Sequence, residues 1–101
     1  MLKPLTFDPT GNTLPCFADA VGRMRDGSET PREFLERCLE RIAAYEPTVR
    51  AFVWFDPAGP RAAADAATQR YRQGRPMSPV DGCPVAIKDI IETADMPTQM
   101  N

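Results

Sequence analysis

The sequence contains no histidine and only three cysteines, Cys16, Cys38 and Cys83, which lie far apart. Without histidine, the chain by itself forms no Ser-His-Asp or Cys-His catalytic arrangement and lacks the commonest transition-metal ligand. The odd number of cysteines and the absence of a Cys-x-x-Cys spacing argue against a disulfide framework and a zinc site. We therefore predict no metal or other cofactor, and any base chemistry must come from lysine or a carboxylate.

The sequence also lacks a strong net charge and a long apolar run. Its formal net charge is -2 and its basic residues are scattered among acidic ones, so we expect no nucleic-acid surface. No apolar run approaches membrane-spanning length, and residues 1–7 contain no apolar signal-peptide core. These absences predict a cytoplasmic protein with no membrane partner.

Residues 1–13 contain prolines and a Gly-Asn pair without a periodic apolar pattern, which predicts an extended arm over the surface. A helix is expected next, over residues 14–26, with Thr13 as its N-cap and Gly27 as its stop. Its apolar residues recur at helical spacing: Phe17, Ala20, Val21 and Met24.

A second helix has a strongly specified start. Thr30 and Glu33 form a capping box, and Pro31 occupies the first helical position. Pro47 is predicted to end this helix. One apolar stripe is expected to face the core: Phe34, Leu35, Cys38, Leu39, Ile42 and Tyr45. Because Cys38 lies within this stripe, we interpret it as a core residue and not as a reactive thiol.

A strand and a third helix are predicted next. Residues 51–55 are aromatic and β-branched, which is typical of a strand, and Asp56 and Pro57 are expected to start a helix over residues 57–73. This helix has a shallow apolar face that would pack on a sheet: Ala62, Ala63, Ala66, Ala67 and Tyr71. Two large aromatic residues are assigned to core or boundary packing in preference to substrate contact: Trp54 and Tyr71.

The segment over residues 79–91 holds the most informative pattern. The turn residues Pro79, Asp81 and Gly82 lead into an apolar, β-branched run, which predicts a strand buried on both faces. A buried helical segment is the alternative that periodicity alone leaves open. Lys88 interrupts this run and is expected at the carboxyl end of the strand.

Two interpretations of Lys88 stay open on residue types alone. A lysine held among apolar groups loses its proton more readily, because desolvation penalises the charged form, and a neutral lysine can act as a base. Alternatively, the side chain reaches water or pairs with Asp89 or Glu92.

The expected order of elements is helix, helix, strand, helix, strand. This order predicts an α/β layer with both strands in one sheet, parallel and joined by a right-handed crossover if they are neighbours. Two short strands do not form a stable sheet, and a strand buried on both faces needs further neighbours. We therefore expect the chain to be incomplete, marginally stable on its own and able to self-associate through exposed strand edges and apolar faces.

The residues from Asp81 to Asn101, beginning Asp-Gly-Cys-Pro-Val-Ala-Ile-Lys-Asp, resemble the signature region of the amidase-signature hydrolases. In that family, a Gly-hydrophobic-Pro-Val-hydrophobic-hydrophobic-Lys-Asp segment carries the catalytic lysine. Residues 27–31 and 46–53 resemble the family's N-terminal run. The resemblance implies that residues 14–101 are the N-terminal portion of an α/β amidase-signature domain, a central mixed sheet covered by helices, whose serine-containing remainder is absent.

Enzymes of this family cleave small carboxamide substrates with a Ser-Ser-Lys constellation and no cofactor. The resemblance implies that Lys88 is the catalytic base and that Asp89 has a supporting hydrogen-bonding role. A hydroxyl nucleophile needs a nearby base, which lysine can supply. Both serines are expected beyond Asn101, so the chain alone is expected to be inactive. Ser28 and Ser78 precede regular elements and are interpreted as turn or capping residues.

Two other groupings near Lys88 are assigned no chemistry. In a strand, Cys83 and Lys88 point to opposite faces, so a Cys-Lys pair is not expected. The spacing of Asp89, Glu92 and Asp95 is more typical of a solvated face than of a metal site.

Several functions stay open. Residues 93–100 resemble stand-alone bacterial amidases more than the amidotransferase subunit that amidates glutamate on transfer RNA, which is kept as an alternative. A helical docking or self-association module belongs to a different class and would make Lys88 dispensable. A lysine enzyme that forms Schiff bases is a third alternative, supported by the lysine alone.

Overall fold

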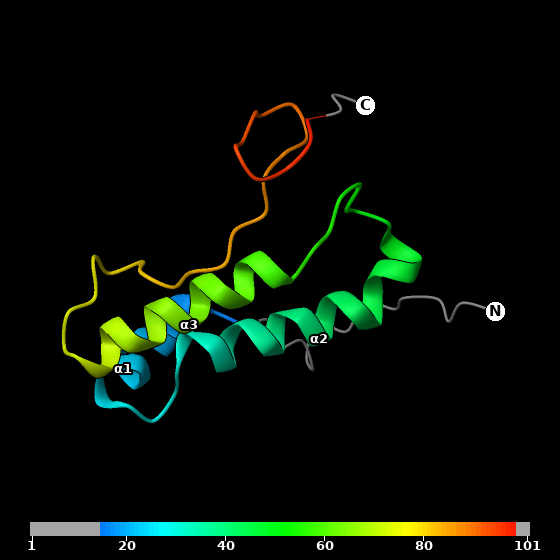
Figure 1. Ribbon diagram of the computed structural model, residues 1–101. Helices are drawn as coiled ribbons and strands as arrows, with labels where there is room; N and C mark the ends of the chain where they lie inside the picture. The colour runs from blue at the N-terminus through cyan, green and yellow to red at the C-terminus, as the bar shows by residue number, and fades with distance from the viewer. Residues whose placement is uncertain (1–14, 99–101) are drawn as a thin grey trace.

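The computed structural model describes residues 15–98, which form three α-helices. Helix α1 spans Phe17–Asp26, α2 spans Pro31–Val49 and α3 spans Ala58–Arg72. Figure 1 shows α2 and α3 side by side and antiparallel, with α1 at the end where α2 begins and α3 ends. After α3 the chain turns back along the helices and then leaves them. The predicted arm over residues 1–13 lies outside the described residues.

Helix α1 starts later than predicted and stops where predicted. It begins at Phe17, and Cys16 occupies the N-cap position without a side-chain cap hydrogen bond. The predicted cap, Thr13, lies outside the described residues. Proline fixes its own φ and restricts the residue before it, so a helix begins more readily after Pro15 than across it. Gly27 ends the helix with a φ of 86°, a left-handed conformation that glycine adopts without steric cost.

The predicted capping of α2 is confirmed. The Thr30 hydroxyl oxygen accepts a hydrogen bond from the Glu33 backbone N–H at 3.1 Å, and Pro31 is the first helical residue. The cap satisfies one of the N–H groups that the first helical turn leaves without a backbone partner. The start of this helix is therefore encoded locally, before any tertiary packing.

The prediction that Pro47 ends α2 is wrong, because the helix continues to Val49. The helix ends instead at Arg50, which has a φ of 52° and donates its N–H to the Glu46 carbonyl oxygen at 2.8 Å. Proline removes one helical N–H donor and bends the axis, but the residues after it can remain helical. Figure 1 shows this bend at the far end of α2.

The core consists of two clusters of buried side chains. The first joins all three helices: Ala20, Met24, Phe34 and Tyr71. The second joins α2 to α3: Leu35, Leu39 and Ala64. The predicted stripe of α2 supplies both clusters, with Cys38 and Ile42 packed against them. Its last member, Tyr45, is 44% exposed, because α2 extends past the start of α3 (Figure 1).

Helix α3 begins at Ala58, one residue later than predicted, because Pro57 and not Asp56 occupies the N-cap position. The Asp56 carboxylate accepts a hydrogen bond from the Ala58 N–H at 3.0 Å. The predicted buried face is wrong in part: Ala64, Ala67, Thr68 and Tyr71 are buried, whereas Ala62, Ala63 and Ala66 are exposed. The Thr68 hydroxyl donates to the Ala64 carbonyl oxygen at 2.8 Å and accepts from the Arg32 N–H at 3.3 Å. These bonds let a polar side chain pack against α2, and that face turns inward.

Neither predicted strand forms among the described residues. Residues 51–55 connect α2 to α3, and the Phe52 N–H donates to a Glu46 carboxylate oxygen at 2.8 Å. Residues 85–91 contain neither helix nor strand. A strand gains its ladder of hydrogen bonds from a neighbouring strand, and residues 15–98 provide none. The helical part of the predicted α/β fold is therefore confirmed, and the prediction of two strands in this chain is wrong.

Gly82 holds the segment after α3 against the start of α2. Its φ is 84°, and a Cβ atom at this position would lie 2.9 Å from the Pro31 Cβ atom and 3.4 Å from the Ala67 Cβ atom. Both the left-handed backbone and the close approach to Pro31 therefore favour glycine.

We expect Gly82→Ala to destabilise the chain by about 1–3 kcal/mol, because the added methyl group meets Pro31 in a strained backbone conformation. The matched control is Gly59→Ala in the first turn of α3, where a Cβ atom meets nothing within 4 Å. That change should leave stability unchanged or raise it. Urea unfolding followed by circular dichroism measures both variants, and equal stabilities would contradict the close packing of Gly82.

Candidate active site

The buried carboxylate of Asp81 organises the segment that leads to the predicted catalytic lysine. Its side chain is 2% exposed. Its oxygens accept hydrogen bonds from the Arg70 guanidinium at 2.7 and 2.8 Å, and one also accepts from the Met77 N–H at 3.0 Å. The hydrogen bonding from Arg70 is the main cause of a lowered pKa for Asp81. From the sequence, Asp81 is only a turn residue, because nothing beside it signals burial.

Tyr71 binds the backbone of the same residue. From within the first core cluster, its hydroxyl donates to the Asp81 carbonyl oxygen at 2.9 Å. Burial raises the pKa of Tyr71, so the hydroxyl keeps its proton for this bond. The predicted packing role of Tyr71 is confirmed, whereas Trp54 is exposed, with 37% of its surface accessible. We call Arg70, Tyr71 and Asp81 together the Asp81 anchor.

Lys88 lies beyond the Asp81 anchor in the sequence, within residues 85–91. These residues belong to the orange segment that leaves the helices in Figure 1. The Lys88 side chain is exposed, and the Lys88 carbonyl oxygen accepts a hydrogen bond from the Ile91 N–H at 3.0 Å. Asp89 is half-buried within this turn. Of the two interpretations left open by the sequence, the described structure shows the one in which the Lys88 side chain reaches water, and the neighbouring Ile87 and Ile90 are 43% and 56% exposed as well.

Ser28 and Ser78 have the turn roles that the sequence predicts. The Ser28 N–H donates to an Asp26 carboxylate oxygen at 2.8 Å, and the Ser78 hydroxyl oxygen accepts from the Val80 N–H at 3.2 Å. These bonds are local to each turn. Neither serine is therefore a substitute for the catalytic serines that the family resemblance implies.

The three cysteines are free thiols. Cys38 packs against the first core cluster, and burial raises the pKa of its thiol, which confirms its predicted core role. Cys83 is partly buried, and its sulfur atom lies 3.6 Å from the Pro84 carbonyl oxygen. The separation of Cys83 and Lys88 onto opposite faces stays a prediction, because it depends on a strand that does not form in the described residues.

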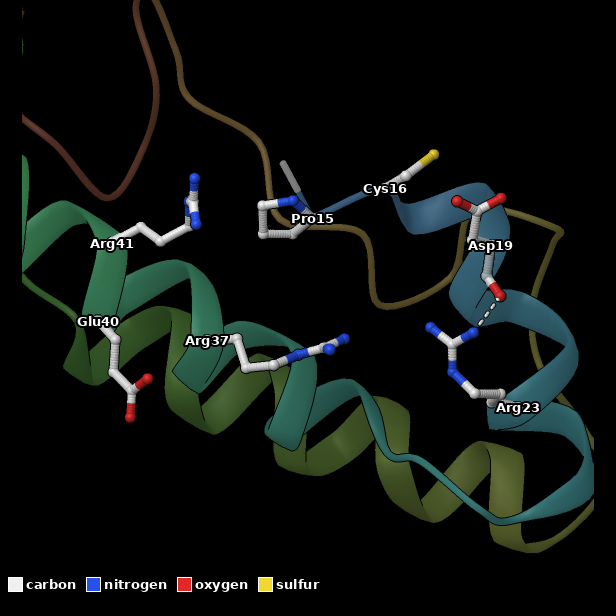
Figure 2. A pocket seen from close by; sticks show the side chains of 7 residues that line it. All are labelled: Pro15, Cys16, Asp19, Arg23, Arg37, Glu40 and Arg41. Atoms are coloured by element: carbon white, nitrogen blue, oxygen red, sulfur yellow. Dashed lines mark hydrogen bonds between the residues drawn. The ribbon is translucent and has the colours of Figure 1, made fainter. Parts of the chain in front are cut away.

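Hollows on the described surface include two that bear on the site. Figure 2 shows one of about 450 Å³, with side chains of both charges: Pro15, Cys16, Asp19, Arg23, Arg37, Glu40 and Arg41. Two of its cations, Arg23 and Arg37, already pair with the buried Glu29. The other hollow, of about 580 Å³, lies on the segment after Lys88: Glu92, Thr93, Ala94 and Thr98. Neither hollow includes Lys88, so neither is a substrate pocket for lysine chemistry.

Residues 15–98 contain neither a metal cluster nor a membrane span. No group of three or more His, Cys, Asp or Glu residues in that range could hold a metal ion. None of the helices there has the length and apolar character needed to cross a membrane.

Residues 33–100 match the protein family described as Amidase, which is more than half of the chain. The chain belongs to the amidase family. The match includes the lysine segment and most of α2, so it confirms the resemblance found in the sequence. No solved structure matches this amidase-family chain.

Several curated relatives are named as a subunit of glutamyl-tRNA(Gln) amidotransferase. One from Chloroflexus aurantiacus is 51% identical over 79 residues, which are 78% of this chain and 16% of that protein. One from Chloroflexus aggregans is 49% identical over 72 residues, covering 71% of this chain and 15% of that protein. One from Salinispora arenicola is 36% identical over 81 residues, covering 80% and 16%. The amidase-family chain therefore spans only about 16% of the length of these relatives.

The lowered pKa of Asp81 predicts a contribution to stability that acid removes. A carboxyl group whose pKa in the folded chain is below its unfolded value of about 3.9 stabilises the fold above that pH. The contribution is lost as the pH falls through the folded-state pKa. We expect Asp81→Asn to lower the free energy of unfolding by about 2 kcal/mol at neutral pH, and by progressively less as the solution is acidified below the unfolded pKa.

Urea unfolding at a series of pH values measures this difference. Asp95→Asn, at an exposed position, is the matched control and should change stability little at any pH. A deficit in Asp81→Asn that stays constant into the acid range would contradict a charged Asp81–Arg70 pair.

The exposed apolar side chains predict that the isolated chain self-associates. Ile90 and Ile91 are 56% and 53% exposed on adjacent positions, and such surface favours association in water. We expect sedimentation velocity to show association that grows with concentration, and serine at both positions to reduce it. Serine at the exposed Ala62 and Ala66 is the control, because it removes little apolar area. A chain that stays monomeric throughout would contradict this prediction.

Proposed function

We propose that this chain is the N-terminal part of an enzyme that hydrolyses carboxamide C–N bonds by a Ser-Ser-Lys mechanism, with Lys88 as the base. The observation that carries the proposal is the place of Lys88 in the family match. Lysine occurs only at positions 3 and 88, and only Lys88 falls within residues 33–100. A lysine mechanism in this family therefore has one candidate base in the matched region.

The proposed role of Lys88 is proton transfer. A serine hydroxyl oxygen attacks the amide carbonyl carbon, and its proton passes through a second serine to the Lys88 amine. The ammonium group then returns a proton to the departing nitrogen, and water hydrolyses the acyl-enzyme by the same route. Both serines lie outside this chain, so the chain alone is proposed to be inactive. Asp89, half-buried beside Lys88, is proposed to support the site by hydrogen bonding.

The proposal requires that the rest of the protein cover the lysine segment. Its apolar side chains, which are 43% to 76% exposed here, support this step: Val85, Ile87, Ile90 and Ile91. We propose that residues 85–91 become a strand in the α/β fold of the complete domain, where neighbouring strands supply the missing hydrogen bonds. Buried apolar groups around a lysine create the environment that favours a neutral amine.

The names of the relatives favour an amidotransferase subunit over a stand-alone amidase, with identities of 51% and 49% to proteins named as a subunit of glutamyl-tRNA(Gln) amidotransferase. An amidotransferase needs a source of nitrogen, and cleavage of a carboxamide C–N bond supplies one. We therefore propose a small carboxamide as the substrate and further subunits as partners. The balanced charge of this chain, net -2, favours transfer-RNA contacts on other parts of such a complex.

The test is hydrolysis of aliphatic and aromatic carboxamides by the full-length protein, with ammonia release as the readout. We expect Lys88→Ala to lower kcat by about 10²–10⁴-fold, the usual contribution of a general base. Lys88→Arg should lower it as much, because a guanidinium keeps the charge but does not give up its proton. Full activity in Lys88→Ala would overturn the assignment of Lys88 as the base. Absence of activity in the wild-type protein as well as in the variant would favour a docking module.

Two further measurements separate the alternatives. Borohydride traps a carbonyl compound on Lys88 only if the lysine forms a Schiff base, so trapping would support the Schiff-base enzyme. Ammonia release that increases when glutamyl-tRNA(Gln) is added would support the amidotransferase subunit. Release that ignores the added RNA would support a stand-alone amidase.

A further inference from the structure

We infer that Arg70, Tyr71 and Asp81 are positioning residues for Lys88: they fix where, and in which direction, the lysine segment leaves the helices. The inference rests on the proposed function, since a position matters for catalysis only if Lys88 takes part in it. The three residues are assigned no contact with the substrate. They act through the backbone between Asp81 and Lys88.

In the Asp81 anchor, Arg70 binds the side chain of Asp81 and Tyr71 binds its backbone. The Arg70 guanidinium holds both carboxylate oxygens at 2.7 and 2.8 Å, and the Tyr71 hydroxyl holds the backbone carbonyl oxygen at 2.9 Å. A fork of two parallel bonds fixes orientation as well as distance. Because side chain and main chain are both bound to consecutive residues of α3, Asp81 can neither rotate nor slide along that helix without losing a buried bond.

The next residues carry this constraint toward the lysine. Gly82 fits against Pro31 at a distance that admits no Cβ atom, and the Cys83 N–H donates to the Val80 carbonyl oxygen at 3.0 Å. Pro84 then restricts the backbone by its fixed φ. The chain thus leaves the helices along a path set within three residues of the anchor.

The Asp81 anchor is the last fully buried point before the lysine. Asp81 is buried and residues 82–84 are partly buried, whereas residues 85–88 are all exposed. Lys88 follows Gly82 by six residues, a span of at most about 20 Å when extended. Residues 85–88 make no buried contact in the described structure, so the point at which the strand proposed above begins is set at Asp81 and Gly82.

The effect on catalysis follows from how little the distance between a base and the proton that it takes can change. A base must lie within hydrogen-bond reach of the proton that it takes, and a misplacement of about 1 Å can cost about 10²-fold in rate. Loss of one bond in the anchor loosens the exit without removing Lys88. The expected signature is a slower chemical step with unchanged substrate binding.

Two conservative variants of the full-length protein test this inference. Tyr71→Phe removes only the hydroxyl and keeps the ring in the core, and Arg70→Lys keeps the charge but loses the two-pronged bond to Asp81. The matched control is Arg32→Lys, which alters an arginine that links α2 to α3 through Asp65, pairs with Glu36 within α2 and has no ion pair with Asp81.

We expect Tyr71→Phe and Arg70→Lys to lower kcat by about tenfold, with KM changed less than about twofold and the basic-group limb of the kcat/KM pH profile displaced. Arg32→Lys should keep the wild-type kcat and profile. Wild-type kcat and pH profile in both anchor variants, with Lys88→Ala inactive, would overturn the inference and leave the proposed function standing. Losses of kcat that follow the melting temperature equally in all three variants would also overturn it. Full activity in Lys88→Ala would remove the proposed function and the inference together.

Discussion

The structure depends on a carboxylate that has been taken out of water. Transfer of an ionised carboxylate into a protein interior costs several kcal/mol unless hydrogen bonds and an opposite charge compensate it. Asp81 receives both from Arg70 and a third bond from the Met77 N–H. Because these partners are available in one geometry only, the loop after α3 folds back onto that helix. Tyr71 and Pro31 then meet residues 81 and 82, and one buried charge thereby links α3, the start of α2 and the lysine segment.

The ion pairs along the contact between α2 and α3 have a different character. Arg61 and Arg32 both bind Glu36, at 2.8 and 2.9 Å, and Arg32 also binds Asp65 at 2.7 Å, but these side chains are 37% to 58% exposed. Exposed pairs contribute about 0–1 kcal/mol each, because water screens them and long side chains must be ordered. The helix pair is therefore held mainly by its buried apolar clusters. The exposed network fixes how α2 and α3 are aligned more than how strongly they bind.

Features that depend on local chemistry could be predicted from the sequence, and features that depend on distant partners could not. The Thr30 cap and the Gly27 stop are decided within a few residues, and both are found. A strand needs a second strand as its hydrogen-bonding partner. The pattern in residues 85–91 therefore indicates a segment that can form a strand, but the three helices supply no partner strand for it. Buried polar residues are the second kind of feature that could not be predicted from the sequence. Thr68 and Asp81 look solvent-exposed in a linear sequence, because the partners that allow their burial are supplied by the fold.

In the candidate site, features that could be predicted from the sequence and features that could not lie in one segment, residues 81–91. Lys88 could be identified from the family pattern, and the match over residues 33–100 confirms that family. The proposed anchor of the lysine segment could not be predicted, because Asp81 gives no signal of burial in the sequence. The two ends of the segment also differ physically. Its beginning is bound to the helices by buried hydrogen bonds, whereas its apolar side chains from Val85 to Ile91 face water. Such a segment has a fixed origin and an uncovered surface, and this arrangement fits the proposal that Lys88 is presented to a site completed by other parts of a protein.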